Sequence, residues 1–96
     1  MSTEVIERPK TRGPGSDLGG LWHIIVNNDD HNTFDGVATV LSRTLPGVTL
    51  DMGYQFANEI HSSGSAIVWS GQLEPAELYW EQLNEFGLTL APLAQG

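Results

Sequence analysis

The sequence predicts a small α+β domain with the element order β-α-α-β-α-β, in which a three-stranded antiparallel sheet packs against three helices. Two short apolar runs, 21–26 and 66–69, are rich in β-branched residues and are typical of buried strands. Elsewhere, apolar residues recur every three or four positions, which indicates amphipathic helices. The 96 residues contain no visible repeat and suffice for one domain. A sheet with one open face must bury the other, and three helices on that face do so.

The first predicted strand, 21–26, runs into six polar residues, Asn-Asn-Asp-Asp-His-Asn, before Thr33. Short Asn and Asp side chains bond to nearby backbone N–H groups, so this segment is typical of a turn and not of a continuing core strand. Thr33 is predicted to cap a helix that begins with Phe34, because its hydroxyl can accept from a backbone N–H of the first helical turn.

Two helices are predicted between the strands. The first ends at Pro46-Gly47, which cannot continue a helix. Its apolar side comprises Phe34, Val37, Ala38, Val40, Leu41 and Leu45. The second starts near Thr49, carries His61 in its last turn and ends at Gly64, which can take the left-handed cap conformation. Its expected buried side comprises Leu50, Gly53, Phe56, Ala57 and Ile60.

A third helix is predicted after the strand at 66–69. Pro75 lies in its first turn, where the missing N–H of proline costs nothing, and Gly87 ends it. Its inner stripe comprises Leu73, Ala76, Trp80 and Leu83, and its solvated acidic face comprises Glu74, Glu77, Glu81 and Glu85. A short third strand is predicted at 88–90, before Pro92.

The net charge is −8, and it is unevenly placed. From Gly13 onward, ten acidic residues stand against one basic residue, Arg43, which gives this part a charge of −9. A body with one arginine and no lysine cannot neutralise phosphates, which argues against binding to nucleic acid or to an anionic membrane surface. An acidic body favours cationic partners, such as an ammonium group.

The absence of cysteine excludes a disulfide framework and a thiolate metal site. The longest apolar run is too short to cross a membrane, and the N-terminus lacks the apolar core of a signal peptide, so a cytoplasmic protein is expected. Residues 1–20, which are rich in Gly and Pro, are expected to form a flexible N-terminal extension, and residues 21–96 the folded domain.

Two motifs carry a family resemblance: Asn28-Asp29-Asp30 followed by Thr33-Phe34, and a helix end at Ile60-His61 followed by Gly64 and a strand. Over about Trp22 to Leu93, the chain resembles the ClpS family, the adaptors of bacterial N-end-rule proteolysis. The resemblance implies a non-enzymatic adaptor without a cofactor. Such an adaptor recognises N-degron substrates, which have a bulky hydrophobic first residue and a free α-amino group. It delivers them to a ClpA- or ClpC-type AAA+ unfoldase for degradation by ClpP.

By this resemblance, the residues that bind the α-amino group are Asn28, Asp29 and His61, and the residues that wall the hydrophobic pocket are Phe34, Ala57, Ile60 and Leu88. The chemistry of the first set suits an α-ammonium, because an amide oxygen, a carboxylate and a neutral imidazole all accept hydrogen bonds. Family members often carry methionine at the positions of Phe34 and Ala57. The preference among Phe, Leu, Tyr and Trp as first residue therefore stays open.

The resemblance also implies that the third helix docks on the N-terminal domain of the unfoldase, through Glu74 and Tyr79. Family members often carry lysine at the position of Tyr79, and this helix has no basic residue. Which unfoldase is served therefore stays open.

Three other interpretations of these residues compete with the adaptor. An acid–base set can be drawn from Asp29, Asp30 and His61, but no activated-nucleophile motif or Gly-rich phosphate loop accompanies it. A calcium loop from Asn28 would need glycine and glutamate where the sequence has threonines, so no metal site is expected. The main alternative is a protein-interaction domain of the same fold that has no amino-terminus pocket and serves a different partner.

Overall fold

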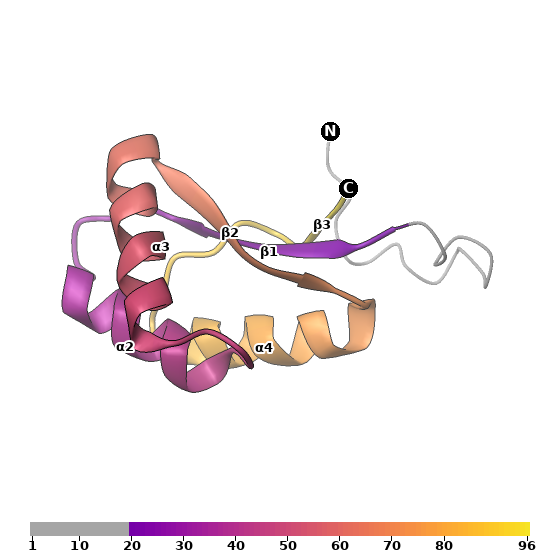
Figure 1. Cartoon of the computed structure of the whole chain (residues 1–96). Coiled ribbons are helices and arrows are strands. Elements are labelled where there is room, and N and C mark those ends of the chain that lie inside the picture. The colour runs from indigo at the N-terminus through magenta and orange to yellow at the C-terminus, as the bar shows by residue number, and fades with distance from the viewer. Residues whose placement is uncertain (1–19) are drawn as a thin grey trace.

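The computed structural model describes residues 20–96 (Figure 1). Its elements are β1 (Trp22–Asn27), α2 (Phe34–Thr44), α3 (Leu50–Ser63), β2 (Ser65–Gly71), α4 (Leu73–Glu85) and β3 (Ala94–Gln95). The predicted α+β class and the element order β-α-α-β-α-β are confirmed. The extension predicted at residues 1–20 lies, apart from Gly20, outside the described residues.

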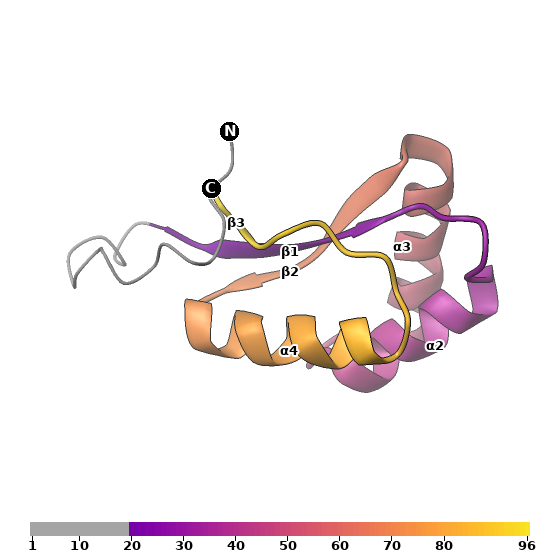
Figure 2. The same ribbon diagram turned by 180° about the vertical axis from the view of Figure 1, so that it is seen from behind.

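The sheet has the strand order β2-β1-β3, and β1 pairs antiparallel with both neighbours. In Figures 1 and 2, α4 lies below the strands, and α3 rises from beside α2 to the start of β2. Side chains of β1 alternate between buried and half-buried, with Trp22, Ile24 and Val26 facing the core. The strand therefore buries only one of its faces, as expected for an antiparallel sheet with a solvated side.

Local capping determines where both central helices begin and where α3 ends. The Thr33 hydroxyl accepts from the N–H of Gly36 at 2.9 Å, and the Thr49 hydroxyl accepts from the N–H of Met52 at 3.1 Å. Gly64 ends α3 in the left-handed conformation, with φ of 96°. These three caps confirm the predicted boundaries, because each depends on residues within one helical turn.

The third strand was predicted at the wrong place. β3 is Ala94–Gln95, and the predicted segment 88–90 forms only one isolated bridge, between Leu90 and Val26. Pro92 has no N–H to donate, so a continuous ladder cannot extend through it. Leu88, which was predicted inside this strand, is instead buried in the core with 4% of its surface exposed.

Two apolar residues predicted in the core are exposed. Leu50 has 49% of its surface exposed and Phe34 has 42%. Leu50 lies one turn before Gly53, where α3 approaches α2 so closely that a Cβ on Gly53 would lie 2.5 Å from the carbonyl oxygen of Ala38. Phe34 is the first residue of α2 and Leu50 is the first residue of α3. Both therefore lie at helix ends, where fewer neighbouring side chains cover them.

Candidate functional site

The polar turn between β1 and α2 is organised around the carboxylate of Asp29. Its Oδ1 accepts hydrogen bonds from the backbone N–H groups of His31 at 3.0 Å and Asn32 at 2.8 Å. Its Oδ2 accepts from Nδ2 of Asn32 and from Oγ1 of Thr89, both at 2.7 Å. A short aspartate side chain thus fixes its own turn and, in addition, a residue far away in the sequence.

These contacts control the charge of Asp29. Burial raises the pKa of its carboxyl, but the hydrogen bonds from Thr89, Asn32 and His31 lower it by more, so the pKa lies well below the ordinary range of an aspartate. The side chain is only 13% exposed. The turn therefore carries a fixed negative charge at neutral and mildly acidic pH.

The turn also contacts two other segments of the chain. The backbone N–H of Asn28 donates to the carbonyl oxygen of Gly64 at 2.9 Å, which joins the turn to the end of α3. The amide of Asn32 donates to the carbonyl oxygen of Gly87 at 3.0 Å. The backbone N–H of Asn27 donates to the carbonyl oxygen of Thr89 at 2.8 Å. Segment 87–89, which follows α4, is therefore held beside the end of β1.

A small cavity of about 20 Å³ lies where these segments meet. Its lining is partly polar and partly apolar, and comprises Val26, Asn27, Asn28, Asp29, Asn32, Val37, Ile60, Leu88 and Thr89. A cavity of this size holds about one water molecule. A bulky side chain enters only if the walls move.

The structure brings together four of the seven residues predicted to bind an N-terminal residue: Asn28, Asp29, Ile60 and Leu88 line the cavity. Two others, Phe34 and His61, contact each other edge-to-face, with ring centroids 5.7 Å apart. His61 directly follows Ile60 in the sequence, but neither Phe34 nor His61 is among the residues that line the cavity. Ala57 is buried in the core, 3% exposed, and does not line the cavity.

Three residues at this site were given no binding role by the sequence analysis. Asn32 and Thr89 both bond to Asp29, and Asp30 is exposed next to them. Among residues 20–96, no hydrogen bond or ion pair engages the Asp30 carboxylate. Thr89 lies 60 residues from Asp29, and no sequence signal pairs the two. Asp30 follows Asp29 directly, and only the fold distinguishes the two carboxylates.

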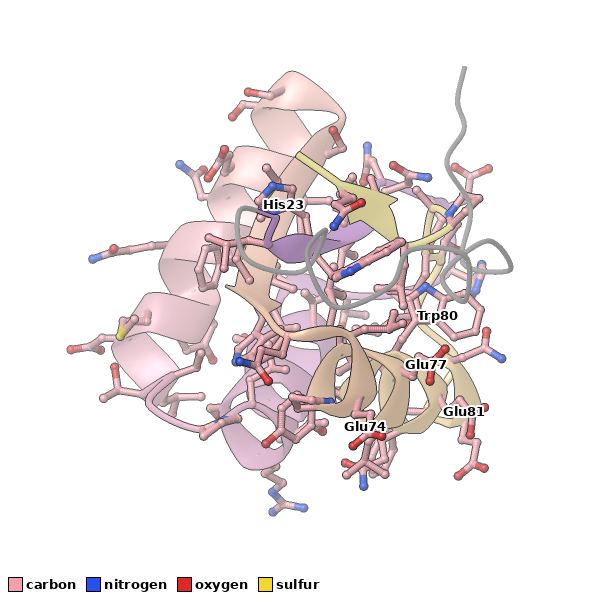
Figure 3. All side chains as sticks on the ribbon, turned by 90° about the vertical axis from the view of Figure 1, so that its right-hand side faces the viewer. His23, Glu74, Glu77, Trp80 and Glu81 are labelled. Atoms are coloured by element: carbon pink, nitrogen blue, oxygen red, sulfur yellow. The ribbon has the colours of Figure 1, made fainter. Side chains whose placement is uncertain are left out.

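The residues predicted to dock on an unfoldase lie on α4. Glu74 is exposed in its first turn, and Figure 3 shows Glu74 and Glu81 projecting from α4 on the side away from the sheet. Tyr79 is half-buried, and its ring packs edge-to-face on Trp69 with centroids 5.1 Å apart. The two side chains therefore differ in their surroundings: Glu74 is exposed, whereas Tyr79 also packs against the core.

Within residues 20–96, no group of three or more His, Asp or Glu side chains is arranged to hold a metal ion. None of the helices in this described part combines the length and the apolar character needed to cross a membrane.

Comparison with known proteins places this chain in a family. The sequence model described as "ATP-dependent Clp protease adaptor protein ClpS" matches residues 19–91. The ClpS adapter protein of a Nostoc species is 51% identical over 72 residues, which cover 75% of this chain and 74% of that protein. The ClpS adapter protein of Thermosynechococcus vestitus is 50% identical over 72 residues, which cover 75% of this chain and 77% of that protein.

A solved structure has the same fold. The structure of Agrobacterium tumefaciens ClpS2 bound to L-phenylalaninamide superposes with a TM-score of 0.73 and 22% sequence identity, over 79% of this chain and 96% of that one. The match to the family model covers most of the chain, including the polar turn, the end of α3 and segment 87–89. The chain therefore belongs to the ClpS family of adaptor proteins of the ATP-dependent Clp protease.

Proposed function

We propose that this adaptor recognises N-degron substrates, that is, proteins with a bulky hydrophobic first residue and a free α-amino group. One observation carries the proposal: the Asp29 carboxylate, which is ionised at neutral pH, and apolar walls line the same cavity. An α-ammonium needs acceptors and a nearby negative charge, and the attached side chain needs an apolar hole. The ligand of the A. tumefaciens ClpS2 structure, L-phenylalaninamide, has both features, a free α-amino group and an aromatic side chain.

Within this proposal, the amide oxygen of Asn28 and the ring nitrogen of neutral His61 accept from the ammonium, as the resemblance implies. Asp29 supplies fixed charge, but its oxygens already receive four internal hydrogen bonds. Asp30 is exposed beside it, without a partner in residues 20–96. We therefore include Asp30 among the candidate direct acceptors of the ammonium and assign its neighbour Asp29 chiefly to the structure of the turn.

The pocket for the first side chain opens by movement of its walls. The cavity of about 20 Å³ is smaller than any bulky side chain. Ile60 and Leu88 are each only 4% exposed, whereas Phe34 is 42% exposed. A shift of Phe34 costs less buried contact than a shift of either aliphatic wall. Among the residues proposed to wall the pocket, Phe34, which does not line the cavity in this structure, is therefore the one that moves. Ala57 is buried and offers no surface to the cavity.

The adaptor then hands its cargo, in the cytoplasm and without catalysing a reaction itself, to a ClpA- or ClpC-type AAA+ unfoldase that feeds ClpP. Glu74 is the exposed docking residue on α4. Tyr79 contributes to the docking surface with the part of its ring that Trp69 does not cover. Because this face of α4 is acidic, the matching surface of the unfoldase N-terminal domain carries basic side chains.

The test is fluorescence anisotropy with labelled peptides that differ only at the first residue: Phe, Leu, Ile and Met, together with N-acetylated Phe, at pH 7.5. Saturable binding of the Phe or Leu peptide that acetylation abolishes is the expected result. No binding to any peptide with a free N-terminus would favour the alternative, an interaction domain of the same fold that serves another partner.

A further inference from the structure

The cavity is lined by the polar turn with its flanking residues Val26 and Val37, and by Ile60 and Leu88 from segments far away in the sequence. Thr89 joins the turn to the segment that carries Leu88. Thr89 lines the cavity together with its neighbour Leu88. Its Oγ1 donates to Oδ2 of Asp29 at 2.7 Å, and its carbonyl oxygen accepts from the N–H of Asn27 at 2.8 Å. Thr89 is thus hydrogen-bonded both to the end of β1 and to the turn that follows it.

The bond to Asp29 differs from the other three that this carboxylate accepts. Those three come from His31 and Asn32, two and three residues along the same turn, although the side-chain amide of Asn32 also donates to the carbonyl oxygen of Gly87. The Thr89 hydroxyl comes from 60 residues away. Together with the bond from Asn32 to Gly87, it therefore holds the turn beside the segment that carries Leu88.

The four hydrogen bonds also limit what Asp29 can do for a ligand. A carboxylate has about four lone-pair sites, and here each oxygen accepts two donors. An incoming ammonium would have to displace one of them. Asp29 therefore acts on a bound N-terminus by its charge and by holding the turn, and both effects depend on where Thr89 holds its carboxylate.

We propose that Thr89 is a positioning residue for N-terminus recognition: its hydroxyl holds the Asp29 carboxylate and thereby keeps Asn28 and Leu88 at a fixed separation across the cavity. This role rests on the proposed function. The role of Thr89 applies to a ligand that carries an α-ammonium and a large side chain on the same carbon. Only such a ligand binds both sides of the cavity at once, and it therefore requires a fixed distance between them.

The experiment compares four proteins in the anisotropy assay with the Phe peptide at pH 7.5: wild type, Thr89→Val, Thr89→Ser and Asp29→Asn. Valine keeps the shape of threonine and removes the donor, whereas serine keeps the donor. Thr89→Val is expected to raise Kd about tenfold, the scale of one lost hydrogen bond to a charged group, and Thr89→Ser to stay within about twofold. Thr89→Ala, which also lacks the donor, takes the place of Thr89→Val if that variant fails to fold.

The double variant Asp29→Asn, Thr89→Val tests whether Thr89 acts through Asp29. If it does, adding Thr89→Val to Asp29→Asn changes Kd by less than about twofold, because the coupled partner is already altered. Thr39→Val, a half-buried threonine on α2 whose side chain makes no hydrogen bond within residues 20–96, is the matched control. In addition, the carboxyl carbon shift of Asp29, followed by NMR, is expected to titrate at higher pH in Thr89→Val than in wild type.

The outcomes separate the two proposals. Equal affinity of wild type and Thr89→Val, equal weakness of the Val and Ser variants, or fully additive effects of Thr89→Val and Asp29→Asn would each overturn the role of Thr89 and leave the proposed function intact. Failure of the wild type to bind any peptide with a free N-terminus would overturn the proposed function, and with it this role.

Discussion

The phenyl ring of Phe34 lies edge-on to the imidazole of His61, with ring centroids 5.7 Å apart and planes inclined by 71°. Phe34 begins α2, and His61 lies in the last turn of α3. The contact joins a residue proposed to accept from the α-ammonium to the residue proposed to move when a side chain enters. Recognition of the amino group and opening of the pocket are thus linked through one aromatic pair.

Replacing Phe34 by alanine is expected to weaken binding of the Phe peptide about fivefold. The variant loses the aromatic contact between the Phe34 ring and the first side chain of the peptide, which contributes roughly 1 kcal/mol. The selectivity for Phe over Ala at the first position is expected to fall by a similar factor. The melting temperature is expected to change little, since Phe34 is 42% exposed. Anisotropy and thermal denaturation measure the two effects. An unchanged Kd for the Phe peptide would rule out Phe34 as a wall of the pocket.

Affinity for cargo is expected to be higher at pH 8 than at pH 5.5. Histidine is the side chain whose protonation ordinarily changes in this range, and an imidazolium at His61 would lose its acceptor and repel the ammonium. Asp29 does not contribute, because its pKa lies well below this range. The check is the Kd of the Phe peptide at both pH values for wild type and for His61→Asn. A pH dependence that persists in His61→Asn would assign the effect to another group.

Asp30→Asn and Asp29→Asn are expected to act differently. Asp30 is exposed and has no partner in residues 20–96, so its substitution is expected to leave the melting temperature unchanged and to raise Kd about tenfold. Asp29→Asn is expected to lower both affinity and stability. Parallel melting and anisotropy curves for the two variants give the comparison. If Asp30→Asn binds like wild type while Asp29→Asn binds poorly without loss of stability, then Asp29 is the direct ligand.

The contribution of Asp29 to stability is expected to depend on pH. Its pKa in the folded protein lies below that of an unfolded aspartate, so the folded state holds the proton less tightly and gains stability when the group is ionised. At pH 7, Asp29→Asn is expected to lower the free energy of unfolding by about 1.5–3 kcal/mol. The difference from wild type shrinks as the pH falls from about 5 to about 2. Urea denaturation at several pH values measures it, and a constant difference would contradict this account.

Gly53→Ala is expected to destabilise the fold by about 2 kcal/mol, although alanine is favoured over glycine in a free helix by about 1 kcal/mol. A Cβ at this position would lie 2.5 Å from the carbonyl oxygen of Ala38, a backbone atom that cannot move without shifting α2. Met52→Ala, an exposed change in the same helix, is the control and is expected to be nearly neutral. Urea denaturation of both variants measures the difference, and a Gly53→Ala protein as stable as wild type would show that the two helices can separate.

The sequence by itself determined the fold class, the element order and most helix boundaries. Thr33, Thr49 and Gly64 were assigned to helix ends correctly, because a cap depends on residues within one turn. The apolar side of the first helix was predicted from the spacing of its residues: Val37, Ala38, Leu41 and Leu45 are buried, whereas Phe34 is exposed and Val40 half-buried. The polar turn was identified from its composition alone.

Only the tertiary structure decided how the site is assembled. The Thr89 bond to Asp29 and the contact of Phe34 with His61 join segments that no local pattern relates. The position of β3 depended on Pro92, which prevents the segment after Leu88 from pairing continuously with β1. The different hydrogen bonding of Asp29 and Asp30 has no signal in the sequence, because two adjacent carboxylates differ only in the donors that surround them. Those donors come partly from Thr89, and only folding brings it to the turn.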